Sequence, residues 1–265
     1  MPGVARRCLL SSFAKTVTMA VASHTVFTLA AQASVKANGG GGKFFADGRV
    51  RPFPGNTIIC HLPQQGQENG AFKALLDIYR SAPGLGFLRN TTLLPPSSYH
   101  MTVFEGATEN SRNKPGKWPA NLSPAASMAE CGQYLANQLK GFRLGFDLPI
   151  RMRVDMDAPI PNGGALTIPL KSIDDEEEQK VRYLRARLSA ATGILIPSPD
   201  TYKFHISLAY WITHPSMDEE ADYSATHLKW REAIQKTVPV INLGAPEYCL
   251  FEDMFAFDRQ FYIGD

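Results

Sequence analysis

The chain has 265 residues, of which 44% are hydrophobic and 20% are charged, a balance typical of a globular protein that can bury a full core. Its apolar runs are too short to cross a bilayer, so a membrane-spanning enzyme is not expected. Five of the 27 basic residues lie in the first 46 residues, which contain no acid, and the remainder carries 22 basic and 25 acidic side chains, a net charge of about −3. This charge predicts no extended nucleic-acid surface, although one phosphate needs only a local cationic pocket.

Residues 1–43 differ in composition from the rest of the chain. They are basic, free of acids, rich in small residues, and end in the run Gly39–Gly42. This composition is shared by secretory signals, mitochondrial presequences and disordered cytosolic extensions, and an overlong gene start with the true start at Met19 would give it too. We expect residues 1–43 to form a disordered or targeting tail and residues 44–265 to form a single soluble domain, in a compartment that the sequence leaves open.

Alternating strands and helices are predicted from residue 44 onward. Strands are expected over 57–62, 99–104, 151–157, 166–170, 204–211, 238–242, 248–251 and 255–263. Helices are expected over 67–81, 123–142, 174–192 and 217–236, with Ser123 as N-cap and Pro124 in the first turn of the second, and Gly193 ending the third. This order indicates two related halves and an α+β fold of mainly antiparallel sheets with outer helices.

The cysteines give no disulfide or metal framework. Cys8, Cys60, Cys131 and Cys249 are widely spaced and form no C-x-x-C pair, which argues against a cysteine-rich zinc site. Three of them lie in the body, and an odd number does not favour paired bridges. Cys60 and Cys249 stand in apolar runs, and we expect buried thiols there.

Two strands repeat the pattern of a histidine followed two residues later by a hydroxyl. Because side chains alternate between the faces of a strand, His100 shares a face with Thr102, and His205 shares a face with Ser207. Their apolar neighbours would then anchor both strands in the core. The sequence repeats this spacing at His214-Pro215-Ser216, but proline there indicates a loop.

A phosphodiester cleavage uses such a pair of groups. The attacking water must lose a proton while the departing oxygen gains one, on opposite sides of the phosphorus. Histidine suits both tasks because its ordinary pKa lies near neutrality. Hydroxyl groups can donate hydrogen bonds to the non-bridging phosphate oxygens and stabilise the added charge.

The segments His100-Met101-Thr102 and His205-Ile206-Ser207 resemble the paired His-x-Thr/Ser motifs of the two-histidine (2H) phosphoesterase superfamily, which includes LigT-type RNA 2′,3′-cyclic phosphodiesterases. The phrases FADGRVRPFPGNTIICHLP and YKFHISLAYW resemble an uncharacterised branch found in fungi and bacteria. The resemblance implies a bilobal fold around a central groove, with His205 as base, His100 as acid, and Thr102 and Ser207 as phosphate contacts. It implies a monomer that needs no metal or other cofactor and hydrolyses nucleoside or RNA-terminal 2′,3′-cyclic phosphates.

Strand alternation also places three neighbours of the two motifs on the same face as the histidines, where they could contact a substrate. Lys203 could attract phosphate, and Phe104 and Trp211 could stack a base, although a solvated lysine and core aromatics are the simpler interpretations. The same alternation places Tyr99, Tyr202 and Tyr210 in the core. His61, with apolar neighbours in the first strand, is interpreted as structural.

Two alternatives remain open at this point. A metal-dependent hydrolase would use both histidines as ligands, but it needs a third ligand, and the sequence has no H-x-x-x-H or H-E-x-x-H spacing. A non-catalytic protein of the same fold would bind a nucleotide or RNA end without turning it over.

Overall fold

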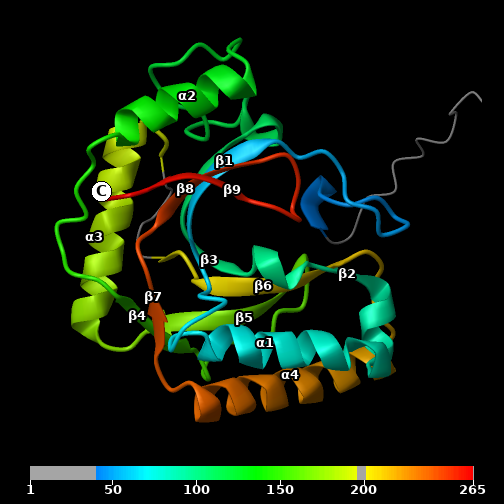
Figure 1. Cartoon of the computed structure of the whole chain (residues 1–265). Coiled ribbons are helices and arrows are strands. Elements are labelled where there is room, and N and C mark those ends of the chain that lie inside the picture. Colours follow the sequence, from blue (N-terminus) through cyan, green and yellow to red (C-terminus); the bar gives the residue numbers. More distant parts are fainter. Residues whose placement is uncertain (1–39, 196–200, 265) are drawn as a thin grey trace, which may run out of the picture. The chain divides into compact units, whose positions relative to one another are not determined.

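The two histidine-bearing strands lie side by side at the centre of a curled sheet (Figure 1). The computed structural model describes residues 40–195 and 201–264, which contain nine strands and four α-helices. The strands are β1 (Gly55–His61), β2 (Thr91–Leu93), β3 (His100–Thr108), β4 (Ile150–Val154), β5 (Ala165–Ser172), β6 (His205–Trp211), β7 (Ile241–Leu243), β8 (Glu247–Phe251) and β9 (Asp258–Tyr262). The helices are α1 (Gly70–Ser81), α2 (Met128–Leu139), α3 (Asp175–Thr192) and α4 (Met217–Thr237).

The sheet consists of two halves that meet at β3 and β6. Its order is β7-β4-β5-β6-β3-β1-β8-β9, with β2 paired to β6, and all these pairs are antiparallel. The helices lie outside the sheet: α1 packs on α4, and α2 packs on α3, which also contacts β3, β4 and β5 and so touches both halves (Figure 1). The predicted α+β fold with a mainly antiparallel sheet and outer helices is therefore confirmed.

The expected tail, residues 1–43, lies outside the described residues except for its last four. Within residues 40–195 and 201–264, none of the helices combines the length and the hydropathy that a membrane span requires.

The helix α3 begins and ends as its sequence predicts. The Asp174 side chain accepts a hydrogen bond from the Glu177 backbone amide, and Gly193 takes the left-handed conformation, with φ of 69°, that ends the helix. Four acidic residues in the first turn, Asp175 to Glu178, lie where the helix dipole favours negative charge.

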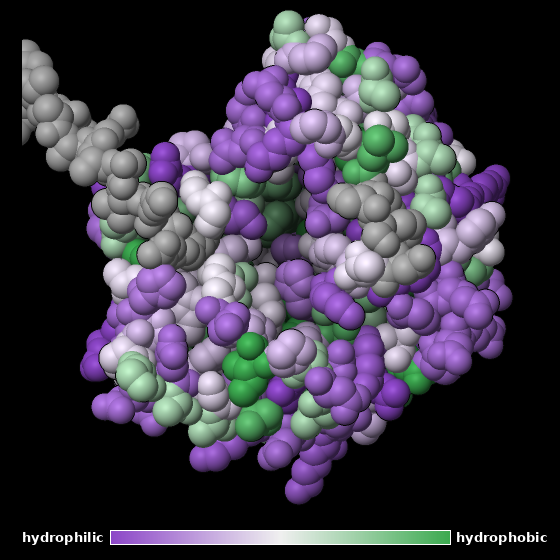
Figure 2. Space-filling view, turned by 180° about the vertical axis from the view of Figure 1, so that it is seen from behind, coloured by the Kyte–Doolittle hydropathy of each residue, from purple (hydrophilic) through white to green (hydrophobic). Residues whose placement is uncertain are grey.

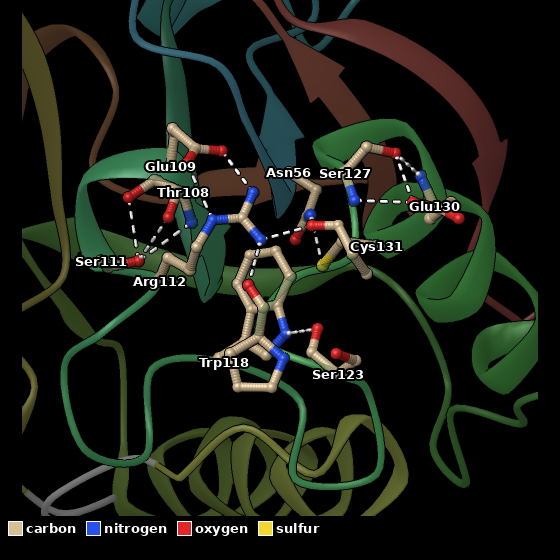
Figure 3. A network of polar contacts seen from close by, with 12 residues as sticks. Asn56, Thr108, Glu109, Ser111, Arg112, Trp118, Ser123, Ser127, Glu130 and Cys131 are labelled. Atoms are coloured by element: carbon tan, nitrogen blue, oxygen red, sulfur yellow. Dashed lines mark hydrogen bonds and ion pairs between the residues drawn. The ribbon is translucent and has the colours of Figure 1, made fainter.

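The predicted start of α2 is wrong. Ser123 and Pro124 belong to a turn, in which the Ser123 hydroxyl accepts a hydrogen bond from the Ala125 amide. The helix begins four residues later, after Ser127, which forms a reciprocal capping box with Glu130 (Figure 3). A serine with an acid three residues later satisfies two backbone amides, whereas Ser123-Pro124 has no such partner, and this difference decides where the helix starts.

Arg112 fixes the long loop between β3 and α2. Its guanidinium lies 4.1 Å from the centroid of the Trp118 ring, pairs with Glu109, and donates hydrogen bonds to the carbonyls of Pro124 and Ala126 (Figure 3). One side chain thus ties three parts of the loop together.

The buried Asn56 side chain joins α2 to the sheet. Its oxygen accepts from the Ala107 amide at 2.9 Å, and its nitrogen donates to Cys131 of α2 at 3.8 Å (Figure 3). Because Asn56 and Thr108 both line the groove described next, this loop and α2 support one wall of that groove.

Candidate active site

Side chains from both halves of the sheet line a groove with a volume of about 300 Å³. It contains the two histidines and the two hydroxyl residues of the predicted motifs: His100, Thr102, His205 and Ser207. Other residues of its wall are Lys43, Phe53, Tyr202, Tyr210 and Phe257. Seen from behind, the molecular surface is hollowed near its centre, with mostly hydrophilic residues around the opening (Figure 2).

The pairing of β3 with β6 brings the two motifs together. Met101 and Ile206 are antiparallel partners, and both are almost completely buried in the core. In an antiparallel pair, one step forward along one strand matches one step back along the other. The register therefore sets His100 beside Ser207 and Thr102 beside His205, all on the groove side of the sheet.

Each histidine ring is held by a hydrogen bond to the backbone carbonyl of the residue two positions before it. The Nδ1 atom of His100 lies 2.7 Å from the carbonyl oxygen of Ser98, and Nδ1 of His205 lies 2.8 Å from the carbonyl oxygen of Lys203. A carbonyl only accepts hydrogen bonds, so these contacts assign the proton of the neutral imidazole to Nδ1. The lone pair is then on Nε2 in each ring, and each ring can take up or release a proton there.

Burial favours the neutral form of both imidazoles. It lowers the pKa of His100 to about 3, against the opposing effect of the Ser98 carbonyl, and the charges of His61, His205 and Lys43 add to the decrease. Burial also lowers the pKa of His205; the Lys203 carbonyl opposes this, while the Lys43 ammonium reinforces it. An anionic phosphate in the groove would act in the opposite direction on both rings.

Phe104 and Trp211, considered as possible base-stacking contacts, do not reach the groove and are core aromatics, because each histidine strand contains a β-bulge. The neighbouring residues Ile59 and Ile58 of β1 pair with Thr102 and Phe104, so β3 has one extra residue between these two. In the same way, Thr167 and Leu166 of β5 pair with Ser207 and Ala209, so β6 has one extra residue between those. One extra residue reverses the alternation of side chains beyond that point. Phe104 is therefore almost completely buried, and Trp211 packs against Phe87 and Tyr223 in the core.

Lys203 is the solvated lysine of the simpler interpretation and not the phosphate contact that was also considered. Its side chain is exposed and is not part of the groove wall, whereas its backbone carbonyl accepts the hydrogen bond from His205. Its contribution in this structure is to the orientation of the imidazole.

Two residues that strand alternation did not predict reach the groove because of the bulges. Tyr210 lines it although it was expected in the core, and Glu105 takes the place that Phe104 would have had. Tyr202, also expected in the core, lines the groove from a position before the start of β6, where strand alternation does not apply. Tyr99 is buried as expected. A bulge inserts one residue without changing the apolar character of a strand, so no signal in the sequence indicated this exchange.

Lys43 supplies a cation to the groove from outside the predicted domain core. Its ammonium donates a hydrogen bond to the Tyr210 hydroxyl at 2.9 Å and lies 4.7 Å from the centroid of that ring. The residue is the last of the expected tail, residues 1–43, so the sequence did not predict it in the groove. Its charge and its position make it a suitable contact for a phosphate.

Tyr202 is held in place by a buried arginine of α3. The Arg185 guanidinium lies 3.9 Å from the centroid of the Tyr202 ring, donates to the Val103 carbonyl, and pairs with Glu105 at 3.4 Å. These contacts link a helix on the outside of the sheet to the aromatic wall of the groove.

An α+β fold in which two halves bring paired His-x-Thr/Ser strands to one groove is the arrangement expected for the two-histidine phosphoesterases. Residues 43–161 match the family model named 2H-phosphodiest, described as a domain of unknown function (DUF1868). The resemblance inferred from the motifs is thereby confirmed, and a phosphodiesterase-type function is supported at the level of the family. The match includes His100 and Thr102 and ends before the second motif.

The chain is also similar to a solved structure, a conserved protein of unknown function from Agrobacterium tumefaciens. The two are 27% identical, with a TM-score of 0.74, and the similarity covers 84% of this chain and 90% of the other. It therefore extends over both halves of the fold. The comparison with curated proteins gives no match.

Proposed function

We propose that the protein is a metal-independent phosphodiesterase in which His100 and His205 form the acid–base pair. The observation that carries this proposal is the equivalent anchoring of the two imidazoles, each with Nδ1 on a backbone carbonyl and Nε2 left for proton transfer. Two such groups, one from each half, meet the requirement for proton removal and proton donation on opposite sides of one phosphorus.

The proposed reaction proceeds by attack of a water oxygen on phosphorus. By analogy with the family, Nε2 of His205 takes the proton of the water, a new P–O bond forms, and the P–O bond to the leaving oxygen breaks. His100 gives that oxygen a proton from Nε2, which it takes up from solvent when the anionic phosphate enters the groove and favours the imidazolium. Thr102 and Ser207 donate hydrogen bonds to the non-bridging oxygens, and Lys43 supplies positive charge. Exchange with solvent restores the two imidazoles.

Nucleoside or RNA-terminal 2′,3′-cyclic phosphates are the proposed substrates. The groove is of a size that holds a nucleotide and not a folded RNA, and its wall offers the rings of Phe53, Tyr202 and Phe257 for stacking on a base. A cyclic diester at a chain end also exposes its phosphorus without prior unfolding of the substrate.

Substitution of the histidines tests the proposal. His100→Ala or His205→Ala is expected to lower turnover of a 2′,3′-cyclic nucleotide by roughly 10²- to 10⁴-fold, the range for a positioned acid or base. His214→Ala is the matched control, because His214 has the same spacing to a serine but lies outside the groove. Equal turnover by the wild type and His205→Ala would overturn the assignment.

A substrate panel with and without chelator separates the alternatives. Nucleoside 2′,3′-cyclic phosphates, 3′,5′-cyclic nucleotides, 2′,5′-linked oligomers and RNA ends are compared, and the products are identified. Turnover that survives exhaustive EDTA treatment is expected. Activity lost to EDTA and restored by zinc or manganese would favour the metal-dependent hydrolase, and nucleotide binding without turnover of any member would favour the non-catalytic protein.

A further inference from the structure

We propose that His61, Glu247 and Cys249 bind one Zn²⁺ ion where β1 pairs with β8. One nitrogen, one carboxylate oxygen and one sulfur of these residues all lie within 4.8 Å of one another. Zinc accepts this combination of ligands, and three protein ligands with water at a fourth position form a known class of zinc site.

The sheet itself brings the three residues to one face. Strands β1 and β8 pair with Thr57 opposite Cys249 and Ile59 opposite Glu247, and His61 follows Ile59 by two residues. Because side chains two residues apart share a face, the imidazole, the carboxylate and the thiol converge without the aid of any loop. Ligands on paired strands are held more firmly than ligands on loops.

The ligand atoms are close to a geometry that zinc can occupy. Nδ1 of His61 already lies 2.8 Å from Oε2 of Glu247. Zinc bond lengths of about 2.0–2.3 Å require ligand atoms roughly 3–4 Å apart. A modest rotamer adjustment of the Cys249 thiol and the His61 ring is therefore sufficient.

The charges also fit a divalent cation. A thiolate and a carboxylate together balance the charge of Zn²⁺, and the imidazole binds in its neutral form. The nearest opposing charge is Arg259, whose Nη1 lies 3.6 Å from Oε2 of Glu247 and whose side chain is nearly half exposed. This arginine can turn to solvent when the ion binds.

The site adjoins the proposed acid–base pair. His61 is the cross-strand partner of His100, and the centroids of their rings are 6.1 Å apart. A Zn²⁺ ion on His61 would therefore lie beside the proposed acid–base pair.

Metal binding to the chelator-stripped full chain tests the site directly. Zn²⁺ is expected to bind with a stoichiometry of one, and Co²⁺ to give a thiolate-to-metal charge-transfer absorption band. That band should disappear in Cys249→Ser and persist in Cys60→Ser, a matched control because the Cys60 thiol points the other way, toward the Gly244 carbonyl. His61→Gln should weaken Zn²⁺ binding by roughly tenfold or more. It provides a substitution at a partly exposed side chain should the variant of the buried Cys249 fail to fold.

Two outcomes would overturn the inference. One is the absence of saturable binding. The other is binding that Cys249→Ser and His61→Gln leave unchanged, which would place the ion elsewhere. Binding does not depend on turnover, so the site can be established even when the proposed function fails.

Discussion

At His205, burial and the Lys43 ammonium both oppose protonation of the imidazole. We expect its pKa, followed by NMR titration of the ring protons, to lie below the ordinary value near 6.5. Lys43→Gln should raise this pKa, because removal of a positive charge makes the protonated form less costly.

Lys203→Gln is the matched control for this prediction. Lys203 is two residues from His205 and carries the same charge, but its side chain is exposed and only its backbone carbonyl acts on the imidazole. The Lys203→Gln substitution should therefore leave the pKa of His205 unchanged. An equal shift in both variants would show a general effect of net charge and contradict the specific role of Lys43.

Which residues of the groove could be predicted depends on how each reaches it. The pairs His100 with Thr102 and His205 with Ser207 follow from local alternation, which holds over three residues of a strand. Tyr210 reaches the groove only after the bulge in β6, and Lys43 reaches it from a segment far away in sequence. Neither contact is encoded in the pattern of the segment that supplies it.

Among the elements, α2 offers a direct test of how a helix start is chosen. Ser127→Ala removes the hydroxyl that accepts from the Glu130 amide, and it should lower the free energy of unfolding by about 1 kcal/mol. Ser123→Ala, at the position that the sequence favoured, should change it by less than about 0.5 kcal/mol. Denaturant titration of both variants measures the two changes in the free energy of unfolding. A larger decrease for Ser123→Ala than for Ser127→Ala would contradict Ser127 as the residue that sets the start of the helix.

The positions of the elements were predictable to a greater extent than their ends. Helix α3 carries its acidic first turn, its cap and its terminal glycine in one continuous segment, so the sequence predicts both ends. For α2, two serine caps four residues apart compete, and the decision depends on Glu130 and on how Arg112 holds the preceding loop. The order of the strands across the sheet likewise depends on contacts between distant segments.

For the whole molecule, the distribution of charge predicts a weak dependence on salt. The chain beyond residue 46 has a net charge of about −3, so Lys43 in the groove is not part of a long basic surface. The logarithm of kcat/KM for a short substrate should fall with the logarithm of salt concentration by the equivalent of one to two phosphates, with a slope of roughly −0.7 for each. Steep dependence together with tight binding of long RNA would contradict this prediction.

The equivalent anchoring of His100 and His205 also bears on the direction of the reaction. The group that removes a proton in hydrolysis must return it when the bond is re-formed, so acid and base exchange roles in the reverse direction. Because both rings carry the same tautomer on the same kind of support, the proposed mechanism allows proton transfer in either direction across the phosphorus. The solvent, at its high concentration, then decides the outcome, and an alcohol that enters in place of water would become a phosphoryl acceptor.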